Sequence, residues 1–228
     1  MDRTQLELLV KEAVRDADLR ASEIPAIDLY VDQITSLTSD KLKEGADRFH
    51  DRVLTKTMIN NYSKDGLISP IKGKKYSKEQ ILQMLLVYSM KNTLSINEIK
   101  QILQGVYSLP SYNTAMLEGV YERFLDIKEQ ERASAWEAVQ GFIDFHGFDT
   151  HDDGDFFTLI LGMAALSSYF KSIAQALLEE RYPSLETESK DEQKRQKEEE
   201  KKEKKEKKEE KKAAKNKKDD ATIKEDAQ

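Results

Sequence analysis

Basic side chains gather between Arg52 and Lys78. This segment holds seven Lys or Arg residues and one acid, Asp65. Residues 1–185 contain 21 basic and 28 acidic groups, so the rest of that region carries a net charge of −13. Neutralising phosphates supplies most of the affinity of proteins for DNA. A basic patch on an acidic body therefore predicts a polyanion-binding surface here.

Residues 56–64 have the spacing of an amphipathic helix. At 100° per residue, Lys and Asn side chains share one face and Met58, Ile59 and Tyr62 fall opposite. Asn can pair with adenine edges, and Lys and Thr can contact phosphates or bases. The pattern predicts a DNA-reading helix followed by a lysine-rich segment. The predicted DNA-binding residues are Arg52, Thr55, Lys56, Thr57, Asn60, Asn61, Tyr62, Lys64, Lys72, Lys74 and Lys75.

A second interpretation of the polar face is that it is merely exposed to water. One helix alone does not separate the two interpretations, because exposed helix faces are usually polar. The coincidence with the lysines at residues 72–75 favours DNA binding.

The local sequence around this helix marks its ends. Thr55 is a suitable N-cap, and Gly66 stands where a left-handed residue often ends a helix. Residues 67–76 predict a two-stranded wing or an extended loop. Ser77 with Gln80, and Ser95 with Glu98, are capping boxes that predict the next two helices.

Helical spacing dominates the rest of the chain, so the expected class is all-α: a winged helix-turn-helix, a helical C-terminal unit and a charged low-complexity tail. Flanking helices are expected over residues 4–19, 27–45 and 155–180. Residues 116–143 predict one bent helix or two. The expected organisation is an N-terminal helix (1–22), the winged helix-turn-helix (23–110), a helical unit that could dimerise (111–185) and a Lys/Glu-rich tail (186–228).

The segment from Leu54 to Pro70 resembles the recognition helix and following turn of the mercury-resistance-regulator (MerR-like) superfamily. The residues from Lys74 to Ser77 resemble the exit of that family's wing, and those from Leu94 to Leu103 its next helix. The resemblance implies that Tyr62 and Lys74 contact phosphates. It also implies binding to double-stranded DNA as a homodimer.

This segment departs from the family at two positions, since Asn60 replaces an Arg and Asn61 replaces a Tyr. Residues 24–30 and 54–62 also resemble a bacterial family described only as a domain of unknown function. That resemblance implies a bacterial source and no activity.

Motifs for catalysis and metal binding do not emerge from the sequence. The acidic run at residues 149–155 has Ile160 where a calcium loop needs a bidentate Glu, so we interpret it as helix capping. Three His residues are too few and too dispersed for a zinc site. There is no Gly-x-Ser-x-Gly elbow and no Gly-rich phosphate loop. We therefore expect neither enzymatic activity nor a cofactor.

The chain has no cysteine, which excludes disulfides and permits a reducing compartment. Asp2 and Glu7 stand where a signal peptide would need basic and apolar residues. The run from Phe156 to Leu166 is 11 residues, whereas a membrane span needs about 20. We therefore expect a cytoplasmic protein that does not enter a membrane.

The function that these observations favour is transcription regulation by DNA binding. The alternative is a protein-interaction adaptor that reuses the helix-turn-helix as a docking module and the tail as a tether. Asn60, Asn61 and the overall acidity favour this alternative.

The tail holds 16 basic and 15 acidic residues and almost nothing apolar. It therefore has no means of stabilising a core by apolar burial. Truncation after Glu186 is expected to leave the thermal midpoint unchanged in a melt followed by circular dichroism. A drop of several degrees would show that the tail packs on the body.

Overall fold

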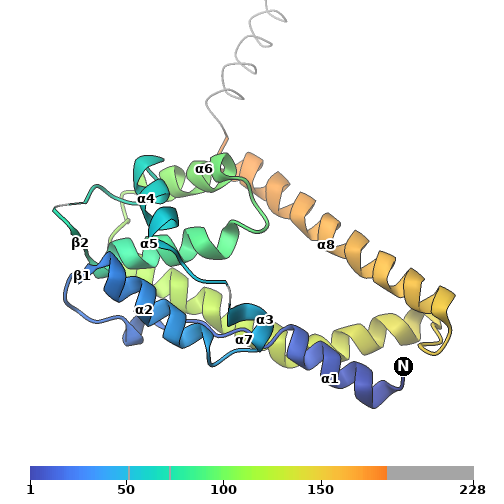
Figure 1. Cartoon of the computed structure of the whole chain (residues 1–228). Coiled ribbons are helices and arrows are strands. Elements are labelled where there is room, and N and C mark those ends of the chain that lie inside the picture. The colour runs from blue at the N-terminus through green and yellow to red at the C-terminus, as the bar shows by residue number, and fades with distance from the viewer. Residues whose placement is uncertain (51, 72, 184–228) are drawn as a thin grey trace, which may run out of the picture. The chain divides into compact units, whose positions relative to one another are not determined.

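A computed structural model describes residues 1–50, 52–71 and 73–183 of the protein (Figure 1). Over these residues the fold is mostly helical, which confirms the expected all-α class. Residues Met1–Tyr182 form one compact unit. The tail predicted at 186–228 and the predicted contact Lys72 lie outside the described residues. In chain order the elements are α1 (Arg3–Ala13), the 3-10 turn η1 (Ala21–Glu23), β1 (Leu29–Tyr30), α2 (Val31–Leu42), α3 (Asp47–His50), α4 (Lys56–Lys64), β2 (Lys75–Tyr76), α5 (Lys78–Met90), α6 (Ile96–Tyr107), α7 (Thr114–His146) and α8 (Asp153–Arg181).

The core is built around α5, which contacts α4, α7 and β2. Ile81, Leu82, Met84 and Val87 on this helix have no exposed surface. These side chains point in several directions from the axis, so α5 has to be covered on most sides. The helices α2, α4, α6 and the first half of α7 supply further buried side chains of the same cluster, and the rest come from η1, the two strands and the connecting segments.

Ser77 and Ser95 begin α5 and α6, as predicted. The Ser77 hydroxyl accepts a hydrogen bond from the backbone N–H of Gln80, and Ser95 does the same for Glu98. In both cases the side chain at the third position returns a bond to the backbone of the serine. These contacts are local, which is why the sequence pattern identified them.

The two strands do not form a wing within residues 67–76. Only β2 lies in that segment, and it pairs antiparallel with β1, so that Leu29 faces Tyr76 and Tyr30 faces Lys75. The rest of the segment bonds to side chains of α5. Gln80 donates to the carbonyls of Ser69 and Pro70, and Gln83 accepts from the N–H of Ser69 at 2.7 Å.

The first two predicted helices are shorter than expected. The segment after α1 is not helical because Asp16 and Asp18 are bound to Lys128 and Arg132 of α7, at distances of 2.6–3.3 Å. The helix predicted at 27–45 begins only at Val31, since residues 29–30 form β1.

The helix α7 is continuous over 33 residues, which resolves the choice left open between one helix and two. Its polar stretch at 128–132 does not interrupt the helix, because Lys, Glu, Gln and Arg are good helix formers. The same stretch supplies the partners of Asp16 and Asp18. Gly147, with φ of +68°, ends the helix in the left-handed conformation. The second half of α7 packs on α1, where Ile143 and Leu6 share a small core.

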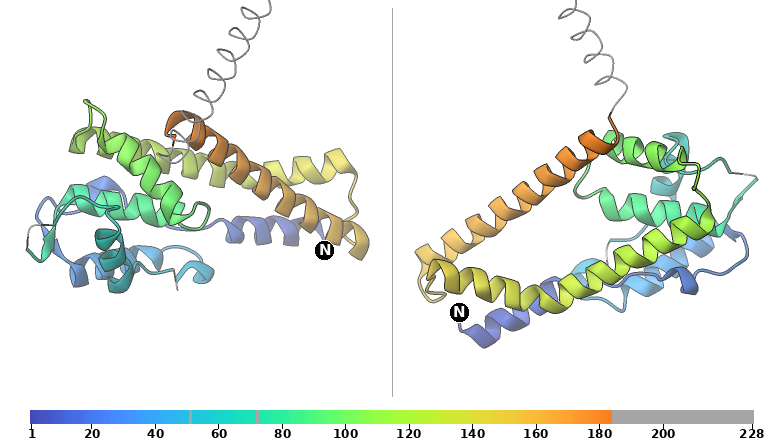
Figure 2. Two further views of the ribbon diagram at one scale, coloured as in Figure 1. Left: turned by 90° about the horizontal axis from the view of Figure 1, so that it is seen from above. Right: turned by 180° about the vertical axis from the view of Figure 1, so that it is seen from behind.

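The last helix, α8, leaves the end of α7 and runs back to α6 (Figure 2). It is long and apolar enough to cross a membrane by length and composition. A helix was expected at residues 155–180, but not as a candidate membrane span, because only the 11-residue run from Phe156 to Leu166 was counted. Length and composition alone do not distinguish a membrane span from a helix that is covered by protein.

Gln83 joins α5 to the chain after α4. Its side chain is fully buried and donates to the Ser69 hydroxyl at 2.9 Å and the Tyr112 hydroxyl at 2.8 Å. The variant Gln83→Ala leaves buried polar groups without these partners, so we expect a loss of about 1–3 kcal/mol in the free energy of unfolding. Urea unfolding measures the change, and Gln104→Ala, at an exposed position on α6, is the control. Equal stability of the two variants would contradict the role of Gln83.

Candidate nucleic-acid interface

The helix α4 has the two faces that its sequence predicts. Ile59 and Tyr62 are buried, whereas five polar side chains of this helix are exposed. The Thr55 hydroxyl caps the helix by accepting from the N–H of Met58 at 3.3 Å. Gly66 follows with φ of +69°, a conformation that favours glycine. The exposed side chains of α4 are Lys56, Thr57, Asn60, Asn61 and Lys64.

The helix α2 packs on α4, so these two helices form the scaffold of the candidate site. Their connection, residues 43–55, contains the short helix α3. Phe49 of α3 is buried, so this connection is anchored rather than loosely attached. It is longer than the turn of three or four residues that usually joins a helix-turn-helix.

Lys74 lies exposed just before β2, and Lys75, which is also exposed, is the first residue of that strand. The Lys75 ammonium lies 5.0 Å from the centre of the Tyr30 ring on β1. Gly73 allows the turn before them, with φ of +81°. Since β1 runs directly into α2, the strand pairing holds Lys75 beside the start of that helix.

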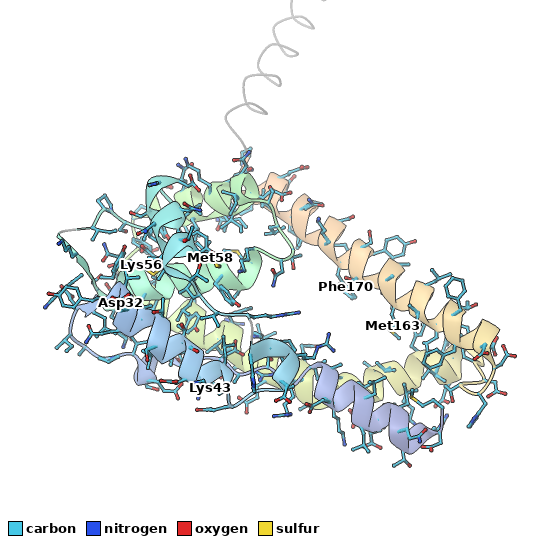
Figure 3. The ribbon with its side chains drawn as sticks, in the orientation of Figure 1. Asp32, Lys43, Lys56, Met58, Met163 and Phe170 are labelled. Carbon is cyan, nitrogen blue, oxygen red and sulfur yellow. The ribbon has the colours of Figure 1, made fainter. Side chains whose placement is uncertain are left out.

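Lys56 reaches the same region from α4. Its ammonium lies 3.6 Å from a carboxylate oxygen of Asp32, in the first turn of α2 (Figure 3). Both side chains are largely exposed, so this ion pair contributes little free energy and a phosphate could replace the carboxylate. The start of α2 therefore brings together one lysine from α4 and one from the β2 segment.

Arg52 lies before α4, where its guanidinium stacks on the Phe49 ring at 4.8 Å from the centroid. Burial and the positive charge of Arg52 lower the pKa of Lys91, at the end of α5. The Lys91 ammonium lies 3.8 Å from the Met58 sulfur on α4. Lys91 is thus a further cation beside α4. The sequence reasoning missed it because it lies 27 residues after Lys64.

Tyr62 does not lie on this surface, which corrects its prediction as a phosphate contact. The residue is 4% exposed, and its hydroxyl is buried without a hydrogen-bond partner among the described residues. Burial raises the pKa of Tyr62 to about 12. The position matches the family motif, but the ring is part of the core beneath α4.

Other chemistry finds little support in the described residues. Over 1–50, 52–71 and 73–183, no group of three or more His, Asp or Glu side chains could hold a metal ion. A small cavity of about 50 Å³ lies between Leu19, Leu54, Leu85 and Tyr121. A cavity of this size holds at most a few water molecules.

Comparison with known families places this surface within a single domain. Residues 19–124 match the family described as Domain of unknown function (DUF1836). A DUF1836 domain is therefore found in this chain. The match runs from Leu19 to Phe124, so the DUF1836 domain includes the whole of α2 to α6 and the candidate interface, whereas α1 and α8 lie outside it. No curated protein and no solved structure matches the chain.

The burial of Tyr62 can be tested inside the DUF1836 domain. The variant Tyr62→Phe removes a buried hydroxyl that has no partner among the described residues, so we expect an equal or higher thermal midpoint and unchanged DNA affinity. The contrasting variant is Tyr121→Phe, which removes a hydroxyl that donates to the Leu19 carbonyl at 2.8 Å. The free energy of unfolding of the Tyr121→Phe variant should fall by about 1–3 kcal/mol. If Tyr62→Phe weakened DNA binding, the prediction that Tyr62 contacts a phosphate would be supported after all.

Proposed function

We propose that this protein is a transcription regulator that binds double-stranded DNA, with α4 as its recognition helix and the lysines at and before the start of β2 as a second DNA contact. The observation that carries the proposal is the convergence of lysines from these two elements at the start of α2, beside the exposed polar face of α4. The MerR-like resemblance of the sequence favours the same assignment.

The dimensions of α4 suit this role. Its nine residues give a length of about 14 Å, and the major groove is about 12 Å wide. Asn60 and Asn61 are the candidates for base contacts, since an amide can bond to both edge groups of adenine. The lysines are the candidates for phosphate contacts, which give affinity without sequence preference.

A second candidate function is a protein-interaction adaptor that docks through the same surface. Asp32 favours it, because this acid lies within the candidate interface and already pairs with Lys56. The negative charge of the body, −13 outside residues 52–78 and the tail, also opposes close approach to DNA. The two functions differ in how binding to DNA responds to salt and to sequence.

Replacement of Lys72, Lys74 and Lys75 by Ala tests the phosphate contacts. Each lost contact should flatten the slope of log affinity against log salt concentration by about 0.9, so the triple variant should lose two to three units. Its affinity should fall equally for all sequences. The matched control is Lys43→Ala, an exposed lysine just after α2, at the opposite end from Asp32 (Figure 3). Fluorescence anisotropy on selected and scrambled duplexes gives both quantities.

Replacement of Asn61 by Ala tests base reading. We expect a loss of about 1–3 kcal/mol on the preferred duplex and little change on scrambled DNA, because an amide pairing with adenine acts at one base pair. The preferred duplex comes from selection with the wild-type protein. If selection yields no preferred duplex, or the triple lysine variant binds as well as wild type, the regulator assignment fails and the adaptor takes its place.

A further inference from the structure

The helix α8 exposes a large apolar surface that the described residues of one copy do not cover. Only Leu159 and Leu178 of this helix are buried. Eight of its large apolar or aromatic side chains are at least a third exposed, among them Phe170 at 69% and Leu177 at 66%. A helix that is apolar all round is normally covered, by a protein core or by lipid. The eight side chains are Phe157, Ile160, Leu161, Leu166, Tyr169, Phe170, Ile173 and Leu177.

One stripe of this helix has the spacing of a helix–helix seam. Leu159, Met163, Leu166, Phe170, Ile173 and Leu177 follow one another at alternating steps of four and three residues. This spacing keeps apolar side chains on one face and is typical of helices that pack lengthwise. Met163 and Phe170, seven residues apart, lie on the same side of α8 (Figure 3).

The two halves of the stripe differ in their surroundings. Leu159 and Met163 belong to a small core with Ile143 and Phe142 of α7. From Leu166 onward the stripe is exposed. The seam thus begins as an intramolecular contact and continues without a partner among the described residues.

The helix is nevertheless tied at both ends. At its start it packs on α7. Near its end, the Gln175 amide donates to the Glu98 carboxylate at 2.6 Å, and the Gln101 side chain donates to the carbonyl of Tyr182. The Tyr182 ring lies so close to Gly105 that a Cβ there would overlap the ring. Bringing the exposed stripe onto its own body would therefore break contacts that α8 already makes.

Two other ways of covering α8 fit less well than a second copy of the chain. The residues after Pro183 include only two large apolar side chains, Leu185 and Ile223, so they cannot supply an apolar surface. The stretch from Phe156 to Leu178 holds one charged side chain, Lys171, and is long enough to span a hydrocarbon core of about 30 Å. Insertion into a membrane would, however, require release of the contacts that hold both ends of α8.

The exposed area matches what a dimer needs. The seam side chains Leu166, Phe170, Ile173 and Leu177, with Tyr169 beside them, offer roughly 600 Å² on each copy, taking about 200 Å² for a fully exposed large side chain. Two copies together would bury roughly 1,200 Å², above the roughly 1,000 Å² that a specific protein interface should reach. A two-fold contact uses the same patch on both copies, so the stripe of one copy can pack against the same stripe of the other.

We propose that two copies of this chain dimerise by packing their α8 helices antiparallel through the second half of the stripe. The steps from Leu166 to Leu177 are four, three and four residues, which read the same in both directions. Leu166 of one copy then meets Leu177 of the other, and Phe170 meets Ile173. A parallel pairing would bring together two helix starts that each carry Asp152, Asp153 and Asp155, which like charge disfavours. This dimer does not depend on the proposed binding to DNA.

Solution mass tests the dimer without DNA. Light scattering after gel filtration should give twice the chain mass of 26.3 kDa at micromolar concentration. The double variant Phe170→Asp with Ile173→Asp should halve that mass and keep its helical circular dichroism, since both residues are exposed in a single copy. The matched control is Ile27→Asp, which is 69% exposed, as Phe170 is, but lies outside α8.

Single cysteines test the antiparallel register, because the chain has none of its own. Ile173→Cys lies near the proposed two-fold axis and should cross-link to itself with a short bismaleimide. Leu166→Cys should not, but it should cross-link when mixed with Leu177→Cys. Self-cross-linking by Leu166→Cys alone would overturn the antiparallel arrangement.

Two outcomes overturn the dimer itself. One is a wild-type monomer at micromolar concentration, and the other is a double variant that stays dimeric. A monomeric wild type that floats with phospholipid vesicles, while the double variant does not, would assign α8 to a membrane instead. Loss of the dimer with intact selection of a DNA sequence would leave the proposed function standing.

Discussion

The burial of α5 is the constraint on which the rest of the DUF1836 domain depends. Four of its apolar side chains have no exposed surface, so other elements have to cover it. The buried amide of Gln83 adds a second requirement, because an unpaired amide in a core costs free energy. It is met by the backbone of Ser69 and the hydroxyl of Tyr112. Through these contacts, α5 determines where the chain turns after α4 and where Lys74 and Lys75 lie.

Ion pairs are the second kind of interaction that holds the structure together. Arg20 bonds to Glu122, Asp126 and Glu129, and Lys128 with Arg132 binds Asp16 and Asp18, so the segment after α1 is held along α7 by ion pairs. Such partly exposed pairs individually contribute little. Their number on one helix gives the segment a defined position, which apolar packing provides only at Leu19 and Ala21.

The candidate interface and α8 use opposite kinds of surface. The face of α4 is polar and basic, and its side chains can keep their hydration until a charged partner arrives. The face of α8 is apolar, and leaving it in water forfeits the stabilisation of roughly 25 cal/mol for each Å² that burial would give. The two surfaces lie on different parts of the chain, the first inside the DUF1836 domain and the second outside it. The proposed binding and the proposed dimer can therefore be tested by separate mutations.

The sequence by itself determined the features that depend on neighbouring residues. Thr55, Ser77 and Ser95 begin helices by bonding to backbone three residues on, and Gly66 follows α4 in the left-handed conformation. The two faces of α4 follow from its 3.6-residue period. These contacts span a turn or two, so pattern reasoning reaches them.

Only the tertiary structure decided what depends on distant residues. Tyr62 matches a surface contact by motif but is buried, because α4 presents that face to the core. The strand β2 pairs with β1, more than 40 residues earlier, because the carbonyls of Ser69 and Pro70 already bond to Gln80. The helix α1 ends early because Asp16 and Asp18 have partners on α7, 110 to 116 residues away. In each case a partner far along the chain overrides the local preference, and no local pattern contains that information.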